Sequence, residues 1–457
     1  MKIVVCIRQG LDGEINPFDA CAYEEALKME GAEITLLSMG PSSVQDTLLR
    51  LTRLGAKCAV LLCDKTFAGA DTLATAYTLS LAINKLSPDL VLCGRQTLVG
   101  DTAQTGPMLA TLTKMGLITN VMQINGIEES SVTCTTRTEG TFTSSLPALL
   151  TVERINTLRL PRLRSKIGEI EIWNAQDIGA DPQKCGLAGS PTRVLKTFEN
   201  EAGKRKCKFI SRTELDAAIA EGLRKNREKT ASEQIGGMTL ANVCIVGESP
   251  RPFAETIATD ITVLPLSNAD TLAEEIQARK PSAVLWGSDA KSKRIAAEVA
   301  AKLSLGLCAD CTTLETDGKT LLMYRPALSG SIIAKIQSLT TPAMATVRTD
   351  DGNAKDIIVG AGYGVKDRLD ALQSFAASHN AELAATRKMT DNGITPYEWQ
   401  VGLTGKTVSP PIYIAVGISG AVHHIVGMQR AGTVIAINPD RNAPIFDYAD
   451  YGITEEF

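Results

Sequence analysis

The strongest constraint on the fold of this chain is a regular alternation between short runs of β-branched and aliphatic residues and longer helical stretches. The alternation predicts strands at 3–7, 34–39, 59–62 and 90–93, separated by helices at 20–30, 43–54, 71–85 and 105–115. Strands that alternate with helices form βαβ units, in which a mostly parallel sheet carries helices on both faces. Asp89-Leu-Val-Leu-Cys93 is apolar at consecutive positions, as expected for a strand buried on both faces. The sequence therefore predicts an α/β fold with a doubly wound parallel sheet.

A later region repeats the first in the same order along the chain. Three pairs of segments match: Pro88-Asp-Leu-Val-Leu-Cys-Gly94 with Pro281-Ser-Ala-Val-Leu-Trp-Gly287, Ala70-Asp-Thr-Leu-Ala74 with Ala269-Asp-Thr-Leu-Ala273, and Pro147-Ala-Leu-Leu-Thr-Val152 with Pro342-Ala-Met-Ala-Thr-Val347. Any one match could arise by chance, but three in order indicate two copies of one doubly wound domain.

The pattern changes twice more along the chain. Residues 186–238 are rich in charge, so we expect a solvated linker, with one amphipathic helix at 211–224 where Ser211 and Glu214 have capping-box spacing. Beyond Asp350 a third α/β region begins, with strands predicted at 356–359, 412–416 and 434–437 and helices at 366–378 and 421–428.

These patterns divide the chain into three domains and a linker. We expect a nucleotide-binding domain at 1–185, the charged linker at 186–238, a shortened second copy at 239–350 and a third α/β domain at 351–457. A length of 457 residues agrees with this number of domains at roughly 150 residues each.

Composition excludes several classes of protein. The 47 basic and 51 acidic side chains give a net charge of −4, which offers no reason to expect nucleic acid as a partner. No apolar run approaches the roughly 18 residues of a membrane span, and the N-terminus enters a strand without signal-peptide architecture. The 11 cysteines are odd in number and lack framework spacing, so we expect reduced thiols and a cytoplasmic location.

Metal binding has little support in the sequence. Cys308-Ala-Asp-Cys311 is a lone Cys-x-x-Cys without a second pair or a nearby histidine, which argues against structural zinc. Its apolar context also differs from a redox motif at a helix start. We therefore expect these two cysteines to lie in the core, and we predict no metal site.

A glycine-rich loop follows the strand at 90–93 and leads into a helix. Glycines let the backbone approach a ligand, and free N–H groups at a helix start favour phosphate oxygens. An ordinary polar loop capped by Asp101 or Thr102 is the alternative. The residues of the loop that could contact a nucleotide are Gly100, Asp101, Thr102, Gln104, Thr105 and Gly106.

The second copy lacks this loop and carries Ser288-Asp-Ala-Lys-Ser-Lys-Arg294 in its place. A loop needed only for folding should survive in both copies. We therefore expect the first copy to bind a nucleotide and the second not to.

A second glycine-rich constellation lies in the third region. Val401-Gly-Leu-Thr-Gly-Lys406 precedes a strand, and Gly417 and Gly420 follow that strand at a helix start, which is typical of a pyrophosphate cradle. Tight packing between strand and helix would explain the same glycines. Two of the chain's three histidines, His423 and His424, come next, on a helix where a histidine is more often a surface or capped core residue.

These residues resemble the electron transfer flavoproteins, and the resemblance covers nearly the whole chain. Residues 1 to about 235 are similar to a beta subunit and residues from about 240 to 457 to a shortened alpha subunit, so the two chains are fused here. The motifs that carry the resemblance are Asn16-Pro-Phe-Asp19, Met39-Gly-Pro41, Ala70-Asp-Thr-Leu-Ala-Thr75, Gly189-Ser-Pro191, Gln400-Val-Gly-Leu-Thr-Gly-Lys406, Val416-Gly-Ile-Ser-Gly-Ala421, Ala436-Ile-Asn438, Ala443-Pro-Ile-Phe446 and Ala449-Asp-Tyr-Gly452.

The resemblance implies that the third domain binds FAD. Arg387 would lie against the isoalloxazine ring, Thr404 near its reactive edge and His424 near the pyrimidine oxygen, so these three would act on the reacting group. The other residues that the resemblance implies for this FAD are Gln400, Val401, Gly402, Gly405, Lys406, Gly417, Ser419, Gly420, Ala421, Asn438 and Asp450.

The resemblance also implies a nucleotide in the first domain. Simpler members hold AMP there and electron-bifurcating members hold a second FAD, and the loop Gly100-Asp-Thr-Ala-Gln-Thr-Gly106 is similar to the bifurcating type. Beside the loop, the implied contacts are Cys6, Asn16, Met39, Thr72 and Thr75.

A bifurcating member takes a hydride from NADH and sends one electron to the third-domain FAD and one to a low-potential acceptor such as ferredoxin or flavodoxin. The alternative is a simple shuttle with one FAD and one AMP, serving acyl-CoA-type dehydrogenases. A homodimer is compatible with either function.

The chain departs from the family pattern in four places. Arg8-Gln-Gly-Leu-Asp-Gly-Glu14 replaces a longer hairpin, Leu403 and His423 each stand where Gln is usual, and Tyr363 stands where Arg is usual. The departures put partner docking, NADH access and the flavin potentials in question.

Overall fold

A computed structural model describes residues 1–10, 13–162, 164–199, 204–229, 238–328, 332–348, 355–403 and 405–457 of the chain. They form two compact units. Unit 1 comprises Met1–Thr197, Gly237–Leu328 and Ala334–Val347, and unit 2 comprises Phe198–Gly236, Ser329–Ile333 and Arg348–Phe457. Thr404 and Asp350, which the sequence singles out, lie outside the described residues.

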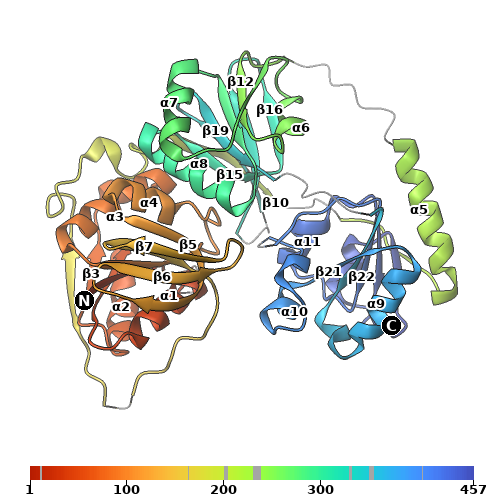
Figure 1. The fold of residues 1–457 in the computed structure, drawn as a ribbon, viewed down its shortest axis with the longest axis horizontal. Coiled ribbons are helices and arrows are strands. Elements are labelled where there is room, and N and C mark those ends of the chain that lie inside the picture. Colours follow the sequence, from red (N-terminus) through yellow and green to blue (C-terminus); the bar gives the residue numbers. More distant parts are fainter. Residues whose placement is uncertain are drawn as a thin grey trace. The chain divides into compact units, whose positions relative to one another are not determined.

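Unit 1 begins with a sheet of nine strands that carries helices on both faces (Figure 1). Its elements are β1 (Lys2–Cys6), α1 (Pro17–Lys28), β2 (Glu33–Met39), α2 (Gln45–Thr52), β3 (Cys58–Leu62), α3 (Thr72–Leu86), β4 (Leu90–Gly94), α4 (Thr105–Thr113), β5 (Gly116–Ile127), β6 (Ser131–Thr136), β7 (Thr141–Ser145), β8 (Ala148–Val152) and β9 (Glu169–Trp173). The strand order is β7-β6-β5-β8-β4-β1-β2-β3-β9, parallel except where β6 pairs with β5 and β7.

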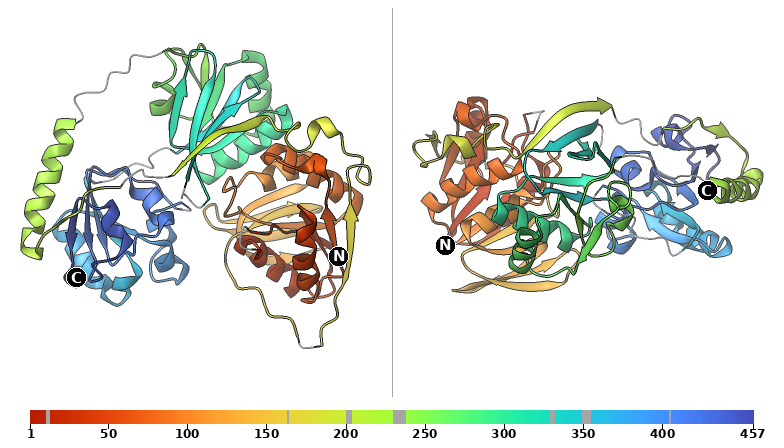
Figure 2. Two further views of the ribbon diagram at one scale, coloured as in Figure 1. Left: turned by 180° about the vertical axis from the view of Figure 1, so that it is seen from behind. Right: turned by 90° about the horizontal axis from the view of Figure 1, so that it is seen from above.

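The second copy has the same topology in a smaller sheet. Its elements are β12 (Val243–Val246), α6 (Arg251–Ala254), β13 (Ile261–Leu264), α7 (Ala269–Arg279), β14 (Ala283–Trp286), α8 (Ala290–Leu303), β15 (Leu307–Cys311) and β19 (Ala343–Val347). Its strand order β15-β19-β14-β12-β13 matches β5-β8-β4-β1-β2 of the first copy, and α8 lies along one face (Figure 2). The predicted α/β fold with an internal repeat is confirmed.

One hydrophobic cluster spans the two copies, and each copy has a further cluster of its own. A single cluster of buried side chains includes Leu109 of α4 and Leu272 of α7, and α4 packs directly against α8. Cys308 and Cys311 are buried on β15, so their predicted core position is confirmed.

A four-stranded sheet completes the second copy. It joins β16 (Thr313–Thr316), β17 (Leu321–Ala327) and β18 (Ile332–Ser338) to β10 (Thr192–Glu199), in the order β10-β18-β17-β16. The charge-rich sequence predicts a solvated linker at 192–199, and the strand β10 found there corrects that prediction. Most of its side chains are exposed, so it lacks the apolar alternation that marks a strand.

Unit 2 contains one parallel sheet of six strands, ordered β11-β24-β23-β22-β20-β21. Its elements are β11 (Lys208–Phe209), α5 (Leu215–Lys229), β20 (Ile357–Ala361), α9 (Leu369–Ser378), β21 (Glu382–Ala385), α10 (Arg387–Asp391), β22 (Ile412–Val416), α11 (Val422–Met428), β23 (Thr433–Ile437) and β24 (Tyr451–Ile453). The predictions missed the short elements β11, β21, α10 and β24.

The predicted amphipathic helix is present as α5, after a short 3₁₀ turn. The Glu214 carboxylate accepts the backbone N–H of Ser211 at 2.9 Å, which confirms the capping box. Leu215 and Ile219 are buried in the core of unit 2, so one face of this helix covers the sheet. No helix among the described residues has both the length and the apolar character needed to cross a bilayer.

Candidate nucleotide-binding sites

The first candidate site lies where the strand order of the first copy reverses. β2 lies on one side of β1 and β4 lies on the other. After β1 the chain continues to β2 on one side, and after β4 it continues to β5 on the other side. In open α/β sheets a crevice forms at the carboxyl ends of such a strand pair and binds ligands. Here it is formed by Ile7 and Arg8 after β1 and by the loop from Gly94 after β4.

Asp19, near the start of α1, joins these two loops. Its carboxylate accepts the backbone N–H of Arg8 at 2.8 Å and that of Gly94 at 3.0 Å. Burial raises the pKa of Asp19 to about 7. Gly94 has no room for a side chain, because a Cβ would lie 2.4 Å from Asp19 Oδ1 and 2.6 Å from Phe18 Cβ.

A cavity of about 360 Å³ opens at this crevice, within the range of small-molecule sites. Hydroxyl, thiol and thioether groups point into it from four elements and the loop. The predicted residues that line the cavity are Cys6, Met39, Thr72, Thr75, Gly100, Thr102 and Thr105. Burial raises the pKa of the Cys6 thiol to about 12, so Cys6 is a neutral lining group.

The other predicted residues of this site are buried behind its lining. Asn16 donates to the carbonyl of Gln96 at 3.0 Å, and Asp101 accepts from the side chain of Gln96 at 2.6 Å. Gly106 allows α4 to approach β8, since a Cβ there would lie 2.4 Å from Thr151 Cγ2. These three residues support the loop.

Gln104 is also buried, and neither polar atom of its amide has a hydrogen-bond partner among the described residues. Buried polar groups are normally paired, so this amide is an exception in the loop, although Gln104 is not among the residues that line the cavity. Asp101 and Ala103 both have φ of +54°, a conformation that is uncommon for non-glycine residues and concentrates at functional sites.

Several lining residues were missed by the sequence analysis. They are Arg8, Arg95, Thr97, Asp71, Thr192 and Arg325. Asp71 caps α3 through Oδ1 and accepts the backbone N–H and the hydroxyl of Thr192 through Oδ2, at 2.9 and 2.7 Å. Its place in the repeated Ala70-Asp-Thr-Leu-Ala74 segment could have indicated the cap, but nothing local marks Arg325 as part of this site.

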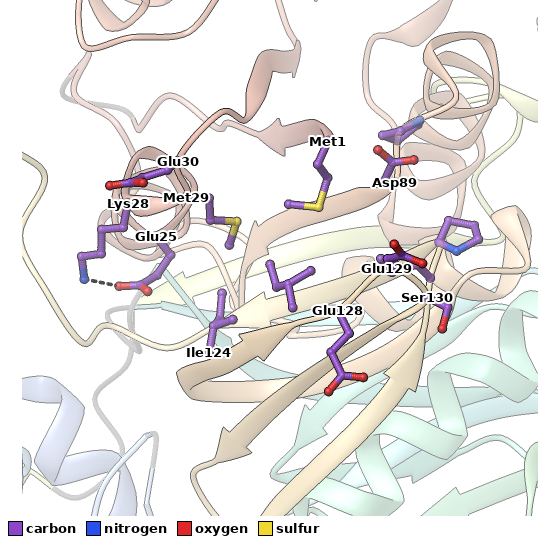
Figure 3. A pocket seen from close by; sticks show the side chains of 14 residues that line it. Met1, Glu25, Lys28, Met29, Glu30, Asp89, Ile124, Glu128, Glu129 and Ser130 are labelled. Atoms are coloured by element: carbon purple, nitrogen blue, oxygen red, sulfur yellow. Dashed lines mark hydrogen bonds and ion pairs between the residues drawn. The ribbon is translucent and has the colours of Figure 1, made fainter.

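A second hollow, of about 970 Å³, lies at the opposite edge of the same sheet, where the strands begin (Figure 3). Lys28 is the only cationic side chain among its lining residues, and it is paired with Glu25 at 2.5 Å. The acidic residues around it are Glu25, Glu30, Asp89, Glu128 and Glu129. This excess of negative charge disfavours a phosphate, so the cavity at the carboxyl ends is the better nucleotide site.

The second candidate site lies at the corresponding crevice of unit 2. β21 lies on one side of β20 and β22 on the other, and the loops after β20 and β22 touch, because the N–H of Gly364 donates to the carbonyl of Gly417 at 3.1 Å. Gly417 and Gly420 have φ of +63° and +93°, and a Cβ on Gly420 would lie 2.1 Å from the backbone nitrogen of Ile445. Both glycines are therefore required by the backbone, as close strand-to-helix packing predicts.

The predicted 400–406 motif lies beside this crevice. The N–H of Lys406 donates to the carbonyl of Gln400 at 2.7 Å, and the N–H of Leu403 donates to the carbonyl of His423 at 2.6 Å. The buried amide of Gln400 accepts from the Thr390 hydroxyl at 3.0 Å. Gln400 therefore helps to fix the loop.

The small residues of this motif pack closely. A Cβ on Gly402 would lie 2.6 Å from the carbonyl oxygen of His423, and one on Gly405 would lie 2.2 Å from that of Gln400. Val401 is buried, whereas Gly405 is exposed and Lys406 is half-buried.

His424, on α11, is buried, and both of its ring nitrogens are paired. Nδ1 lies 3.0 Å from the carbonyl oxygen of Val401, and Nε2 lies 3.0 Å from the hydroxyl of Tyr413 on β22. Burial lowers the pKa of His424 to about 4, so the imidazole is neutral at physiological pH. The resemblance implies a place for His424 near the pyrimidine oxygen of the flavin, and burial disfavours a positive charge on it.

Most of the remaining predicted residues lie at the same end of the sheet as this crevice. Ser419 and Ala421 are exposed, and Arg387 at the start of α10 pairs with Asp391 at 2.9 Å. Asn438 donates to the carbonyl of Ile418 at 2.9 Å. Asp450 precedes β24 at the opposite edge of the sheet, where its carboxylate pairs with Arg205 and accepts the N–H of Val434 at 2.8 Å, so the structure does not bring this predicted residue to the crevice.

Tyr363, where the family pattern has an arginine, lies beside two lysines. The amino groups of Lys366 and Lys388 lie 5.0 and 3.9 Å from the centre of its ring. These lysines place positive charge next to the position that the tyrosine occupies.

Two crevices at strand-order reversals, each formed by glycine-containing loops and polar donors, define a nucleotide-binding α/β protein. The chain matches the Electron transfer flavoprotein domain over residues 3–178 and 260–360, and the Electron transfer flavoprotein FAD-binding domain over residues 353–429. The chain therefore belongs to the electron transfer flavoprotein family.

Curated relatives cover about half of the chain. Protein FixA of Azorhizobium caulinodans is 40% identical over 237 residues, which are 47% of this chain and 84% of FixA. The caffeyl-CoA reductase-Etf complex subunit CarD of Acetobacterium woodii is 37% identical over 242 residues, which are 50% of this chain and 91% of CarD. The electron transfer flavoprotein subunit beta of Clostridium acetobutylicum is 37% identical over 206 residues, which are 43% of this chain and 79% of that subunit.

Proposed function

We propose that this chain carries two FAD molecules, one in the crevice of unit 2 and one in the cavity of unit 1, and that it divides the electrons of NADH between two acceptors. The FAD of unit 1 would accept the hydride from NADH. One of its two electrons would pass by way of the FAD of unit 2 to a dehydrogenase of the acyl-CoA type, and the other would pass to a low-potential acceptor such as ferredoxin or flavodoxin. Bound FAD supplies this chemistry, since a flavin accepts a hydride and releases electrons one at a time.

The observation that carries the proposal is the cavity at the carboxyl ends of β1 and β4. It combines threonine hydroxyls, a loop with two residues of positive φ, and the buried guanidinium of Arg325. These groups fit the phosphates and ribose of a nucleotide. The similarity to CarD, whose name places it in a caffeyl-CoA reductase-Etf complex, favours a role beyond simple shuttling.

In unit 2 the proposed roles follow from position. Arg387 supplies a cation to the flavin ring, and the cradle at Gly417 and Gly420 lets the phosphates approach the backbone. His424 acts as a neutral group that fixes Val401 and α11. Thr404, which lies outside the described residues, is proposed at the reactive edge on the family motif alone.

The alternative is one FAD with one AMP, which would make the chain a simple electron shuttle. The two proposals share the site in unit 2 and differ in the cavity of unit 1. In either case we propose the domain boundaries 1–185, 186–238, 239–350 and 351–457 and a cytoplasmic location. We also propose redox proteins as partners, and a homodimer is compatible with both proposals.

The test is to denature the purified full-length chain and to quantify FAD and AMP per chain by chromatography. Two FAD and no AMP are expected, and anaerobic NADH should then bleach the flavin absorbance. Gly420→Ala in unit 2 and Gly94→Ala in unit 1 should each lower the content of one nucleotide, because each substitution places a Cβ less than 3 Å from neighbouring atoms beside one crevice. One FAD with one AMP and no bleaching would establish the shuttle, and the absence of both nucleotides would refute both proposals.

A further inference from the structure

We propose that Arg325 is the phosphate-binding cation of the cavity in unit 1, so that the second repeat copy completes a nucleotide site built on the first. The inference rests on the proposed nucleotide in this cavity and adds the residue that selects for its phosphate.

Arg325 lies on β17, outside the nine-stranded sheet that forms the crevice, and it lines the cavity. Its side chain is 5% exposed, and Nη2 donates to the carbonyl oxygen of Asp101 at 2.8 Å. Its Nε has no hydrogen-bond partner among the described residues. A buried guanidinium is costly unless its donors and its charge are matched, and one carbonyl satisfies only one donor.

The wall of the cavity that surrounds Arg325 is otherwise uncharged. The second copy contributes six further lining residues: Leu307, Cys308, Ala309, Ala327, Ala334 and Ile336. A single permanent cation in an apolar wall is poorly suited to holding adenine or an uncharged sugar. It is well suited to an anion, because charge-assisted hydrogen bonds strengthen away from water.

The cation faces the part of the first copy best suited to phosphate. Arg325 binds the backbone of the loop at Asp101, and Thr102 and Thr105, which follow in the sequence, also line the cavity. Thr105 begins α4, and the first N–H groups of a helix have no partner within the helix. A phosphate at this position would meet donors from both copies.

A second cation of the cavity is already paired, with a carboxylate that also pairs with Arg137. Arg95 forms an ion pair with the buried Glu153 at 3.2 Å. The carboxylate of Asp71 is occupied by the cap of α3 and by Thr192. Of the three arginines that line the cavity, Arg8 is exposed and Arg95 is paired, which leaves Arg325 as the buried donor for an incoming phosphate.

The test compares AMP with adenosine as probes on the full-length chain freed of bound nucleotide. AMP is also the adenylate half of FAD, so the test applies whichever nucleotide the cavity holds. Arg325→Gln keeps a donor for the Asp101 carbonyl but removes the charge, and Arg325→Lys keeps a charge without the planar fork. Lys335→Gln is the matched control, because Lys335 lies on β18 between the lining residues Ala334 and Ile336 but contacts Glu315 and Tyr324 instead.

We expect Arg325→Gln to weaken AMP binding roughly 10- to 100-fold, as for the loss of a charge-assisted hydrogen bond, and to leave adenosine binding unchanged. The affinity of Arg325→Lys for AMP should lie between that of Arg325→Gln and that of the unsubstituted chain. Lys335→Gln should bind both probes with the affinity of the unsubstituted chain. A loss of both probes to the same extent in Arg325→Gln would make Arg325 a structural residue and overturn the inference. Equal binding of AMP and adenosine by the unsubstituted chain would overturn it too. Failure of the unsubstituted chain to bind either probe would instead remove the proposed nucleotide site.

Discussion

The protonation state of His424 is determined by its two neighbours. The carbonyl of Val401 can only accept, so Nδ1 carries the proton, and Nε2 is then free to accept from the hydroxyl of Tyr413. A second proton would place a charge in the core of unit 2, and this is why the pKa of His424 falls to about 4.

This pKa predicts that unit 2 loses stability as the pH falls. Between the ordinary histidine pKa near 6.5 and the folded value of about 4, the unfolded state binds a proton that the folded state does not. The free energy of unfolding should therefore fall by up to roughly 1.4 kcal/mol per pH unit across this window because of His424. His424→Gln should remove this slope, as measured by urea unfolding at several pH values between 7 and 4.

His379→Gln is a matched control, since His379 is a partly exposed histidine of the same unit that lies 3.1 Å from Asp216. An unchanged slope in His424→Gln would mean that the imidazole is charged in the folded protein.

Asp19 predicts the opposite pH dependence for unit 1. Burial raises its folded pKa to about 7, above the ordinary value near 3.8, so the folded state binds the extra proton between these two values. The stability of unit 1 should therefore fall as the pH rises from about 4 to about 7. Asp19→Asn removes the titration and should abolish that part of the slope in the same unfolding experiment.

Asp19→Asn also removes one of the two acceptors for the N–H groups of Arg8 and Gly94. This loss should lower the free energy of unfolding by about 1 kcal/mol at all pH values. A constant offset with the same slope as the unsubstituted chain would show that Asp19 is ionised throughout.

At the scale of the element, the loop after β4 contains two glycines with different roles. A Cβ at Gly94 would meet Phe18 and Asp19, whereas one at Gly100 would meet only Thr97 Oγ1, at 3.3 Å. Gly94→Ala should therefore destabilise unit 1 by roughly 1–3 kcal/mol and weaken AMP binding, because α1 must move away from β4. Gly100→Ala should change stability by less than about 0.5 kcal/mol, as measured by urea unfolding.

Similar losses in the two glycine variants would mean that the whole loop tolerates no Cβ. In that case close approach of α1 to β4 would not be the reason for Gly94.

The segment before β11 is joined to unit 2 by Arg205. Its guanidinium pairs with Asp450 and donates to the carbonyls of Ala431 and Gly432 at 2.5 and 3.0 Å. Arg205→Gln should lower the stability of unit 2 by roughly 1–3 kcal/mol, because several acceptors lose a charged donor. Urea unfolding measures the loss.

The neighbouring exposed Lys206 gives the control variant Lys206→Gln, which should have no effect. No difference between the two variants would mean that β11 pairs with β24 without help from Arg205.

The elements that could be predicted from the sequence are those whose own residues determine them. The buried strands of both copies and the capping box of α5 follow from local apolar runs and spacing. β10 and β11 could not be predicted, because their exposed side chains carry no periodic pattern and their strand partners lie far away in the sequence. The loop residues of the cavity in unit 1 could be predicted because they form a local glycine-rich motif. Arg325 could not, because only the tertiary packing of the second copy brings it to the cavity.

At the scale of the whole molecule, the distribution of core residues predicts how the chain unfolds. The two repeat copies share one buried cluster, in which Leu109 of the first copy and Leu272 of the second are both almost fully buried. Unit 2 has its own core, which includes Ile414 on β22. Residues that share a core unfold together, whereas compact units with separate cores can unfold independently.

Calorimetry of three variants tests this prediction. Leu109→Ala and Leu272→Ala should each cost roughly 2–5 kcal/mol and lower the same thermal transition, although the two residues belong to different copies. Ile414→Ala should cost a similar amount but lower a different transition. If Leu109→Ala and Leu272→Ala lowered two different transitions, the copies would be separate cooperative units. A cavity lined by residues of both copies would then lose its rigid framework whenever either copy unfolded, and nucleotide binding should stabilise both transitions together.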